Sequence, residues 1–247
     1  MPAGNRGGFN PYRDRRGRWA AADAAPAPAP ATSGGGGAEI NAAIRAAAGR
    51  TAEPTGPRSY HGYAPALATA LRDFEDRTRH NPTESGAVFA PDGSVLVAEK
   101  SGTKKQVTFK KAETATFKGA IVTHNHPTYP GSGDTAFSGG DVSMAIQHGV
   151  SEIRAVVGRF NHVLQMRKPG TQEPAEVSTE VALFDVLYDD SQLAGRLMAR
   201  KGKDPETVAW VEQSIHEQNL TWAKEYGYVY YRENMETGEV EGYGHDG

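Results

Sequence analysis

The first 58 residues of this 247-residue chain limit what it can fold into. They consist largely of Gly, Ala, Pro and Arg, with an Ala-Pro repeat over 25–31 and four consecutive glycines at 34–37. Such a composition buries too little apolar surface to offset the entropy lost when a chain becomes ordered. We therefore expect residues 1–58 to form a disordered tether, and the hydrophobic core to come from the remaining residues.

The composition of the whole chain narrows the classes of function. Lys and Arg number 27 against 30 Asp and Glu, so no general positive field draws the chain to nucleic acid or to an anionic membrane. No apolar stretch reaches about 18 residues, and we expect no membrane-spanning helix. The absence of cysteine excludes disulfides, thiolate metal ligands and a cysteine nucleophile. Because the N-terminus lacks a signal-peptide pattern, we expect the protein in the cytosol, or in a virion assembled there.

The hydrophobic pattern after the tether predicts an α/β (α+β) domain over residues 59–170, with order beginning near Tyr63. Leu67, Leu71 and Phe74 recur at helical spacing, and Asn81-Pro82 ends that helix. Short apolar runs and turn residues then predict a series of strands, with one helix between the fourth and the fifth. The strands are expected at 87–90, 95–99, 107–109, 119–123, 153–157 and 162–166, and the helix at 138–149.

Residues 171–247 are expected to form a mainly helical C-terminal extension. Apolar side chains recur over 181–198, and a second amphipathic helix is expected from Asp204 to about Glu225. The run from Tyr228 to Tyr231 is typical of a terminal strand. The acidic, Gly-rich tail from Glu233 is expected to be frayed.

The strand that ends in Thr123-His124-Asn125-His126-Pro127 carries the strongest functional signal. Side chains at i and i+2 of an extended segment share a face, so His124 and His126 can bind one cation. Pro127 interrupts strand pairing and leaves both imidazoles at an open end of the sheet. Asp141, in the first turn of the next helix, can turn its carboxylate toward the same end. Two His and one Asp would leave the fourth position of a tetrahedral Zn2+ to water, as in catalytic zinc sites.

A structural interpretation competes with the metal site. Ser138 followed by Asp141 at the third helical position is an ordinary N-terminal capping pattern, which needs no metal. The apolar strand before the histidines, Pro127 after them and the Ser-x-x-Asp helix start together favour the metal site.

The same residues carry a family resemblance. Thr-His-Asn-His-Pro followed by Ser-x-x-Asp, over about residues 62–166, resembles the JAB/MPN (JAMM) metalloprotease superfamily, and Asn between the histidines is nearest to its RadC-like branch. The resemblance implies a JAB/MPN-like (cytidine-deaminase-like) mixed sheet flanked by helices. It also implies zinc bound by His124, His126 and Asp141. Ser138 would stabilise the oxyanion, and Glu84 at the start of an early strand would be the general base.

Two departures from the family pattern leave alternatives open. The family has seven residues between the second His and the Ser, whereas this chain has eleven, from Pro127 to Phe137. The extra residues fall in a turn-rich loop that contains Asp134, a rival ligand. Glu99, on the neighbouring predicted strand, is the rival of Glu84 as the base.

The sequence therefore supports three functional hypotheses. The first is a zinc-dependent metallopeptidase or isopeptidase that acts on a protein or peptide substrate, with the tether attaching it to a larger assembly. The second is a non-catalytic JAB-like binding module. The third is a nucleic-acid-associated accessory protein, which only the Arg-rich tether and the pairs Lys104-Lys105 and Lys110-Lys111 favour. A short basic stretch within the tether, Asn10 to Trp19, resembles linkers of tailed-phage head and portal-associated proteins, which implies a phage context.

Overall fold

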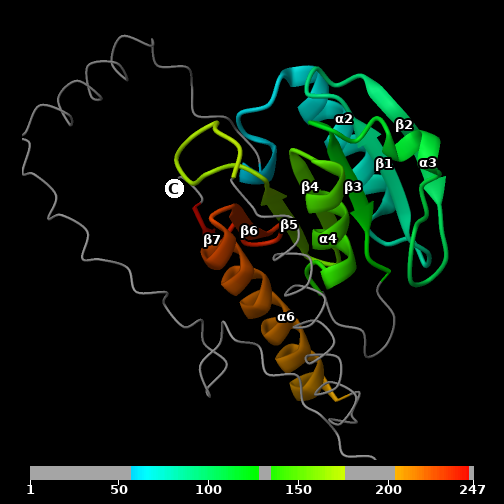
Figure 1. Cartoon of the computed structure of the whole chain (residues 1–247). Coiled ribbons are helices and arrows are strands. Elements are labelled where there is room, and N and C mark those ends of the chain that lie inside the picture. Colours follow the sequence, from blue (N-terminus) through cyan, green and yellow to red (C-terminus); the bar gives the residue numbers. More distant parts are fainter. Residues whose placement is uncertain (1–56, 128–134, 176–203, 245–247) are drawn as a thin grey trace, which may run out of the picture. The chain divides into compact units, whose positions relative to one another are not determined.

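A seven-stranded mixed sheet forms the centre of the protein (Figure 1). The structure is a computed structural model, and it describes residues 57–127, 135–175 and 204–244. The strand order is β2-β1-β3-β4-β5-β6-β7, and within these residues β3 and β4 form the one parallel pair. The strands are β1 (Ser85–Phe89), β2 (Val95–Ser101), β3 (Ile121–Asn125), β4 (Glu152–Val157), β5 (Phe160–Gln165), β6 (Val229–Asn234) and β7 (Val240–Tyr243).

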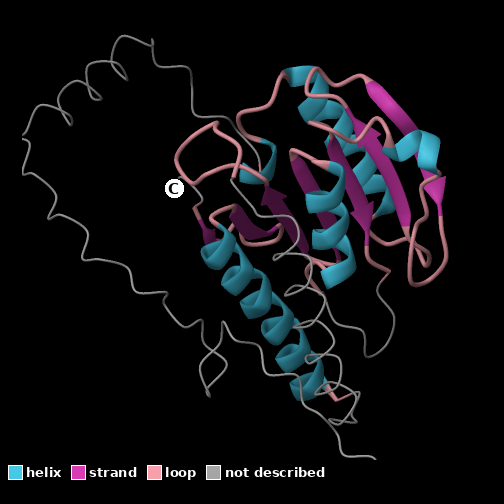
Figure 2. Ribbon diagram, viewed as in Figure 1, coloured by secondary structure: helices cyan, strands magenta, loops and turns pink. Residues whose placement is uncertain are grey.

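Helices cover the two faces of this sheet (Figure 2). The apolar stripe of α2 (Pro65–Thr78) packs on one face, against β1 and β3. On the other face, α4 (Gly139–His148) and α6 (Pro205–Tyr226) contribute to one large core with residues of β1, β3, β4, β5 and β6. Two shorter helices, η1 (Arg58–Tyr60) and α3 (Lys111–Thr114), complete the described elements. The side of the sheet covered by α2 is the α2 face, and the side covered by α4 and α6 is the α4 face.

Local sequence signals mark where the two long helices of the α4 face begin and end. Ser138 caps the start of α4, and Gly149 ends it in the left-handed region with φ of 63°. Asp204 accepts a hydrogen bond from the Thr207 N–H at the start of α6, and Gly227 ends that helix with φ of 67°. Because α4 connects the parallel strands β3 and β4, its first turn lies next to the carboxyl end of β3.

The mixed α/β class predicted from the sequence is confirmed, and most elements lie near the expected positions. The prediction of a strand at 107–109 is wrong. Val107 and Phe109 pack over Gly86 instead of joining the sheet. The tail expected to be frayed contains β7, which pairs with β6 and extends the sheet. Order begins before Tyr63, because Ser59 and Tyr60 are already buried.

Some expectations cannot be compared with the structure. Residues 1–56 of the tether and the whole apolar stretch at 181–198 lie outside the described residues. Within the part that is described, none of the helices is both long enough and apolar enough to cross a lipid bilayer.

The contact between α6 and the sheet contains a buried histidine whose protonation opposes folding. His216 is 2% exposed, and its Nδ1 lies 2.8 Å from the hydroxyl of Tyr230. Burial and the nearby charge of Arg232 lower the pKa of His216 from 6.5 to about 4, although Glu241 acts in the opposite direction. The unfolded chain therefore binds more protons than the folded chain between these two pH values.

We expect this histidine to make the protein less stable as the pH falls from 6.5 toward 4. The free energy of unfolding should drop by up to about 1.4 kcal/mol per pH unit in that window. Urea unfolding at pH 7 and pH 5 measures the drop, and His216→Gln should reduce it because glutamine does not titrate there. An equal drop in the variant and the wild type would contradict the assignment to His216.

Candidate metal centre

Two imidazoles and one carboxylate meet where β3 ends and α4 begins. His124 lies on the α4 face of β3, and His126 follows the last residue of that strand. The N–H of His126 still bonds to the carbonyl of Val156 on β4, which keeps the second histidine beside the sheet. Asp141 lies in the first turn of α4. Among the described residues, these three side chains form the group that could hold a metal ion, with ligand atoms all within 4.8 Å of one another.

The distances between these ligand atoms suit one small cation. Three atoms bound at 2.0–2.2 Å to a tetrahedral ion lie about 3.4 Å from one another. The Nε2 atoms of His124 and His126 are 2.9 Å apart. The Nε2 of His124 lies 3.5 Å from Oδ1 of Asp141, and that of His126 lies 3.7 Å from Oδ2. A modest opening of the imidazole pair would match the separation that the ion requires.

A backbone carbonyl fixes the orientation of the His126 ring. Its Nδ1 lies 3.0 Å from the carbonyl oxygen of Thr135, which can only accept, so Nδ1 carries the proton and donates a hydrogen bond to that oxygen. The lone pair is then on Nε2, the nitrogen that faces His124 and Asp141. Metal-binding histidines commonly donate their other N–H to such a partner.

Burial and neighbouring charges set the protonation states of the three groups. Burial lowers the pKa of His124 to about 4, although Asp141 opposes this shift, so its imidazole is neutral near pH 7. Burial also acts to lower the pKa of His126, but Asp141 and the Thr135 carbonyl outweigh it and raise the pKa. For Asp141, burial acts to raise the pKa, and the two histidines together with Ser138 hold it well below its usual range. A carboxylate that is ionised near neutral pH therefore faces two imidazoles, and such an arrangement favours a cation.

Ser138 both caps α4 and holds the Asp141 carboxylate. Its backbone N–H and its hydroxyl each donate to Oδ2 of Asp141, at 2.9 and 2.8 Å, and its Oγ accepts from the Asp141 N–H at 3.3 Å. The capping pattern and the metal site are therefore compatible, because one carboxylate serves both. In this arrangement the hydroxyl proton of Ser138 points to Asp141.

Glu84 and Glu99, the two candidates for the base, lie on opposite sides of the sheet. Glu84 precedes β1, and its carboxylate interacts electrostatically with His126 and Asp141. Burial raises its pKa, whereas His126 and the Val107 N–H act to lower it. Glu99 instead forms an ion pair of 2.6 Å with Arg77 of α2. The structure thus brings Glu84 to the three ligands and places Glu99 away from them.

Two buried asparagines support the site, and our sequence reasoning assigned a role to neither. Asn125 bonds to the backbone on both sides of Glu84. Asn219 of α6 donates to the carbonyl of Phe137, the residue before Ser138. A polar side chain at the end of an apolar strand is the one sequence feature that indicates a role for Asn125. No local pattern indicates a role for Asn219. Asp134, the rival ligand, lies outside the described residues.

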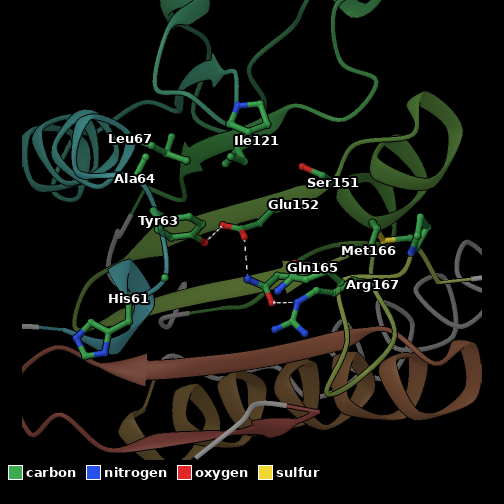
Figure 3. A pocket seen from close by; sticks show the side chains of 14 residues that line it. His61, Tyr63, Ala64, Leu67, Ile121, Ser151, Glu152, Gln165, Met166 and Arg167 are labelled. Atoms are coloured by element: carbon green, nitrogen blue, oxygen red, sulfur yellow. Dashed lines mark hydrogen bonds between the residues drawn. The ribbon is translucent and has the colours of Figure 1, made fainter. Parts of the chain in front are cut away.

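A separate pocket of about 440 Å³ lies at the opposite end of β3 and β4 (Figure 3). Glu152, one of its polar side chains, accepts hydrogen bonds from the hydroxyl of Tyr63 and from the amide of Gln165. Gln165 in turn accepts a bond from Arg167. These polar groups thus bind one another across the pocket, at the far end of the strands from the metal-binding group.

Comparison with known protein families, with curated proteins and with solved structures found no match to this chain. The geometry of the site and the resemblance of its motif therefore carry the function proposed below.

Proposed function

We propose that this protein is a zinc-dependent hydrolase of the JAB/MPN type, acting as a peptidase or isopeptidase on polypeptide substrates. The observation that carries the proposal is the convergence of His124, His126 and Asp141 beside Glu84. The order of elements supports it as well: a helix, two strands, the strand with the histidines, the helix with Ser138 and Asp141, and two further strands.

The donor set suits a catalytic zinc ion. Two neutral imidazole nitrogens and one carboxylate oxygen are common zinc ligands, and three protein ligands leave a fourth position for water or substrate. A zinc ion held there would polarise an amide carbonyl and lower the pKa of a bound water to about 7.

The protein side chains would supply the proton transfers. Glu84 would accept the proton of the attacking water and deliver it to the leaving amine. Burial raises the pKa of Glu84 toward neutral pH, and a group with such a pKa more readily both accepts and delivers a proton. Ser138 would first hold Asp141 in place, and rotation of its hydroxyl would let it donate to the oxygen of the scissile carbonyl.

The test combines metal analysis with an assay for cleavage. Purified protein should bind about one zinc ion per chain, and it should cleave members of a peptide or isopeptide library. A chelator should abolish cleavage, and added zinc should restore it.

His126→Ala removes one of three ligands and should eliminate both stoichiometric zinc and cleavage. His148→Ala is the matched control, because His148 lies at the end of α4, where it packs against Phe117 instead of the site. Stoichiometric zinc without any cleavage would favour the non-catalytic binding module. Absence of zinc from the wild type would refute the proposal.

A further inference from the structure

Asn125, between the two histidines, binds the segment that carries Glu84. Backbone pairing between β1 and β3 runs from Phe89 with Ile121 to Gly86 with His124. One residue farther along, the side chain of Asn125 makes the contact between the two segments. Its Oδ1 accepts from the Ser85 N–H at 2.6 Å, and its Nδ2 donates to the Thr83 carbonyl at 3.2 Å.

These two hydrogen bonds complete a set of four around Glu84. In an extended chain, the N–H and C=O of one residue point to one side, and the C=O before it and the N–H after it point to the other. On the first side, the Glu84 N–H donates to the carbonyl of Thr103 at 2.8 Å, and the Glu84 carbonyl accepts from the N–H of Gly102 at 2.7 Å. Asn125 occupies the second side.

We propose that Asn125 is a positioning residue that holds the backbone of Glu84, so that its carboxylate stays beside the metal ligands. This inference rests on the proposed function, in which Glu84 is the base. The carboxamide provides an acceptor and a donor on one short, planar group. Aspartate lacks the donor, and serine provides a single oxygen atom. Asn125 is completely buried, so water does not replace the two bonds when the amide is removed.

A role limited to general stability would give different results from a positioning role. Loss of the amide would lower the stability of the fold in either case. Only a positioning role predicts that removing the Asn125 amide no longer lowers kcat in a protein whose Glu84 has already been replaced. Only that role also predicts that the segment at 83–85 becomes mobile while the metal ligands stay in place.

The experiment uses the full-length, zinc-loaded protein and the variant Asn125→Leu, which keeps the branched shape of the side chain and removes both hydrogen-bonding groups. We expect kcat to fall by about 100-fold, because small misplacements of a catalytic group have effects of this size. KM and the one-to-one zinc content should not change. Thr123→Val is the matched control, because Thr123 is equally buried on β3 but donates to Glu75 on the α2 face. It should keep kcat within about threefold of the wild type.

A double-mutant cycle and amide hydrogen exchange separate the remaining possibilities. In a Glu84→Gln background, Asn125→Leu should cause no further loss of activity. Exchange at Glu84 and Ser85 should accelerate at least tenfold in Asn125→Leu, whereas exchange in β4 stays as in the wild type. Asn125→Asp, which keeps the size and the acceptor, should give intermediate values and provides a second variant if the leucine variant does not fold.

Several results would overturn the inference. They are an unchanged exchange rate at Ser85, a kcat within threefold of the wild type, and an equal loss of activity in the presence and absence of Glu84. If the wild type cleaves nothing, the proposed function fails, and the exchange measurement still decides whether Asn125 holds this segment. Loss of zinc in parallel with activity would show that Asn125 supports the ligands instead.

Discussion

Replacing Glu84 with Gln is expected to lower kcat by about 10²- to 10⁴-fold, while the protein still binds one zinc ion. Glutamine has nearly the same size as glutamate, but its neutral amide cannot accept the proton of an attacking water. Glu84 is not among the three groups whose ligand atoms converge, so zinc content should stay at that of the wild type. Steady-state kinetics on a cleaved peptide, together with elemental analysis of the same sample, measures both effects.

Glu99→Gln provides the control for this prediction. Glu99 pairs with exposed Arg77 near the surface, so its replacement should leave kcat within about twofold of the wild type. If Glu99→Gln reduces kcat and Glu84→Gln does not, the base has been assigned to the wrong strand. If Glu84→Gln also loses zinc, Glu84 acts as a ligand and the assignment of three ligands is incomplete.

The metal-binding group was predictable because local rules place its members. The alternation of side chains along a strand puts His124 and His126 on one face, and a helix start three residues before Asp141 points its carboxylate toward the same end. Both rules act over a few residues. The connection between Pro127 and Phe137 did not need to be known for the prediction, because α4 begins at its capping residue regardless of loop length.

The choice between Glu84 and Glu99 required information that the sequence does not contain. It depends on the register of β1 against β2 and β3, in which Gly86 lies opposite both His124 and Lys100. On β1, Val88 faces the core of the α4 face, and the alternation of side chains puts Glu84 on the same side. On β2, Lys100 lies opposite Gly86, so Glu99 beside it turns to the α2 face, where it pairs with Arg77. A shift of one residue in either pairing would turn the side chains of the shifted strand to the opposite face, and no sequence pattern fixes the register of these short strands.

The largest feature that sequence reasoning missed is a buried ionic network on the α2 face. Arg154 on β4 is completely buried and binds Glu75 of α2 through two hydrogen bonds, of 2.6 and 3.1 Å. It also bonds to Glu152, to the carbonyl of Ser59 and to the hydroxyl of Tyr63. These partners lie up to 95 residues away along the chain. No periodic pattern can reveal such contacts, and the strand at 153–157 was predicted from its apolar residues alone.

We expect Arg154→Met to lower the free energy of unfolding by about 3–5 kcal/mol, because it leaves buried carboxylates without their cation. Glu75 is completely buried, and without Arg154 it would keep hydrogen bonds from the hydroxyls of Tyr60 and Thr123 alone among the described contacts. Glu152 would keep the hydroxyl of Tyr63 and the amide of Gln165. Hydroxyls and an amide compensate a buried charge less well than a guanidinium does. Urea unfolding of the full-length protein with saturating zinc measures the change.

Arg77→Met is the matched control, since it breaks an ion pair of the same type with Glu99 in which the Arg77 side chain is 59% exposed. Its cost should stay below about 1 kcal/mol, because water solvates the remaining carboxylate of Glu99, whose side chain is 35% exposed. Adding Glu75→Gln to Arg154→Met should recover part of the lost stability, since the substitution removes one of the uncompensated charges. If Arg154→Met costs no more than Arg77→Met, or if Glu75→Gln makes the variant still less stable, burial of the unpaired carboxylate is not the cause.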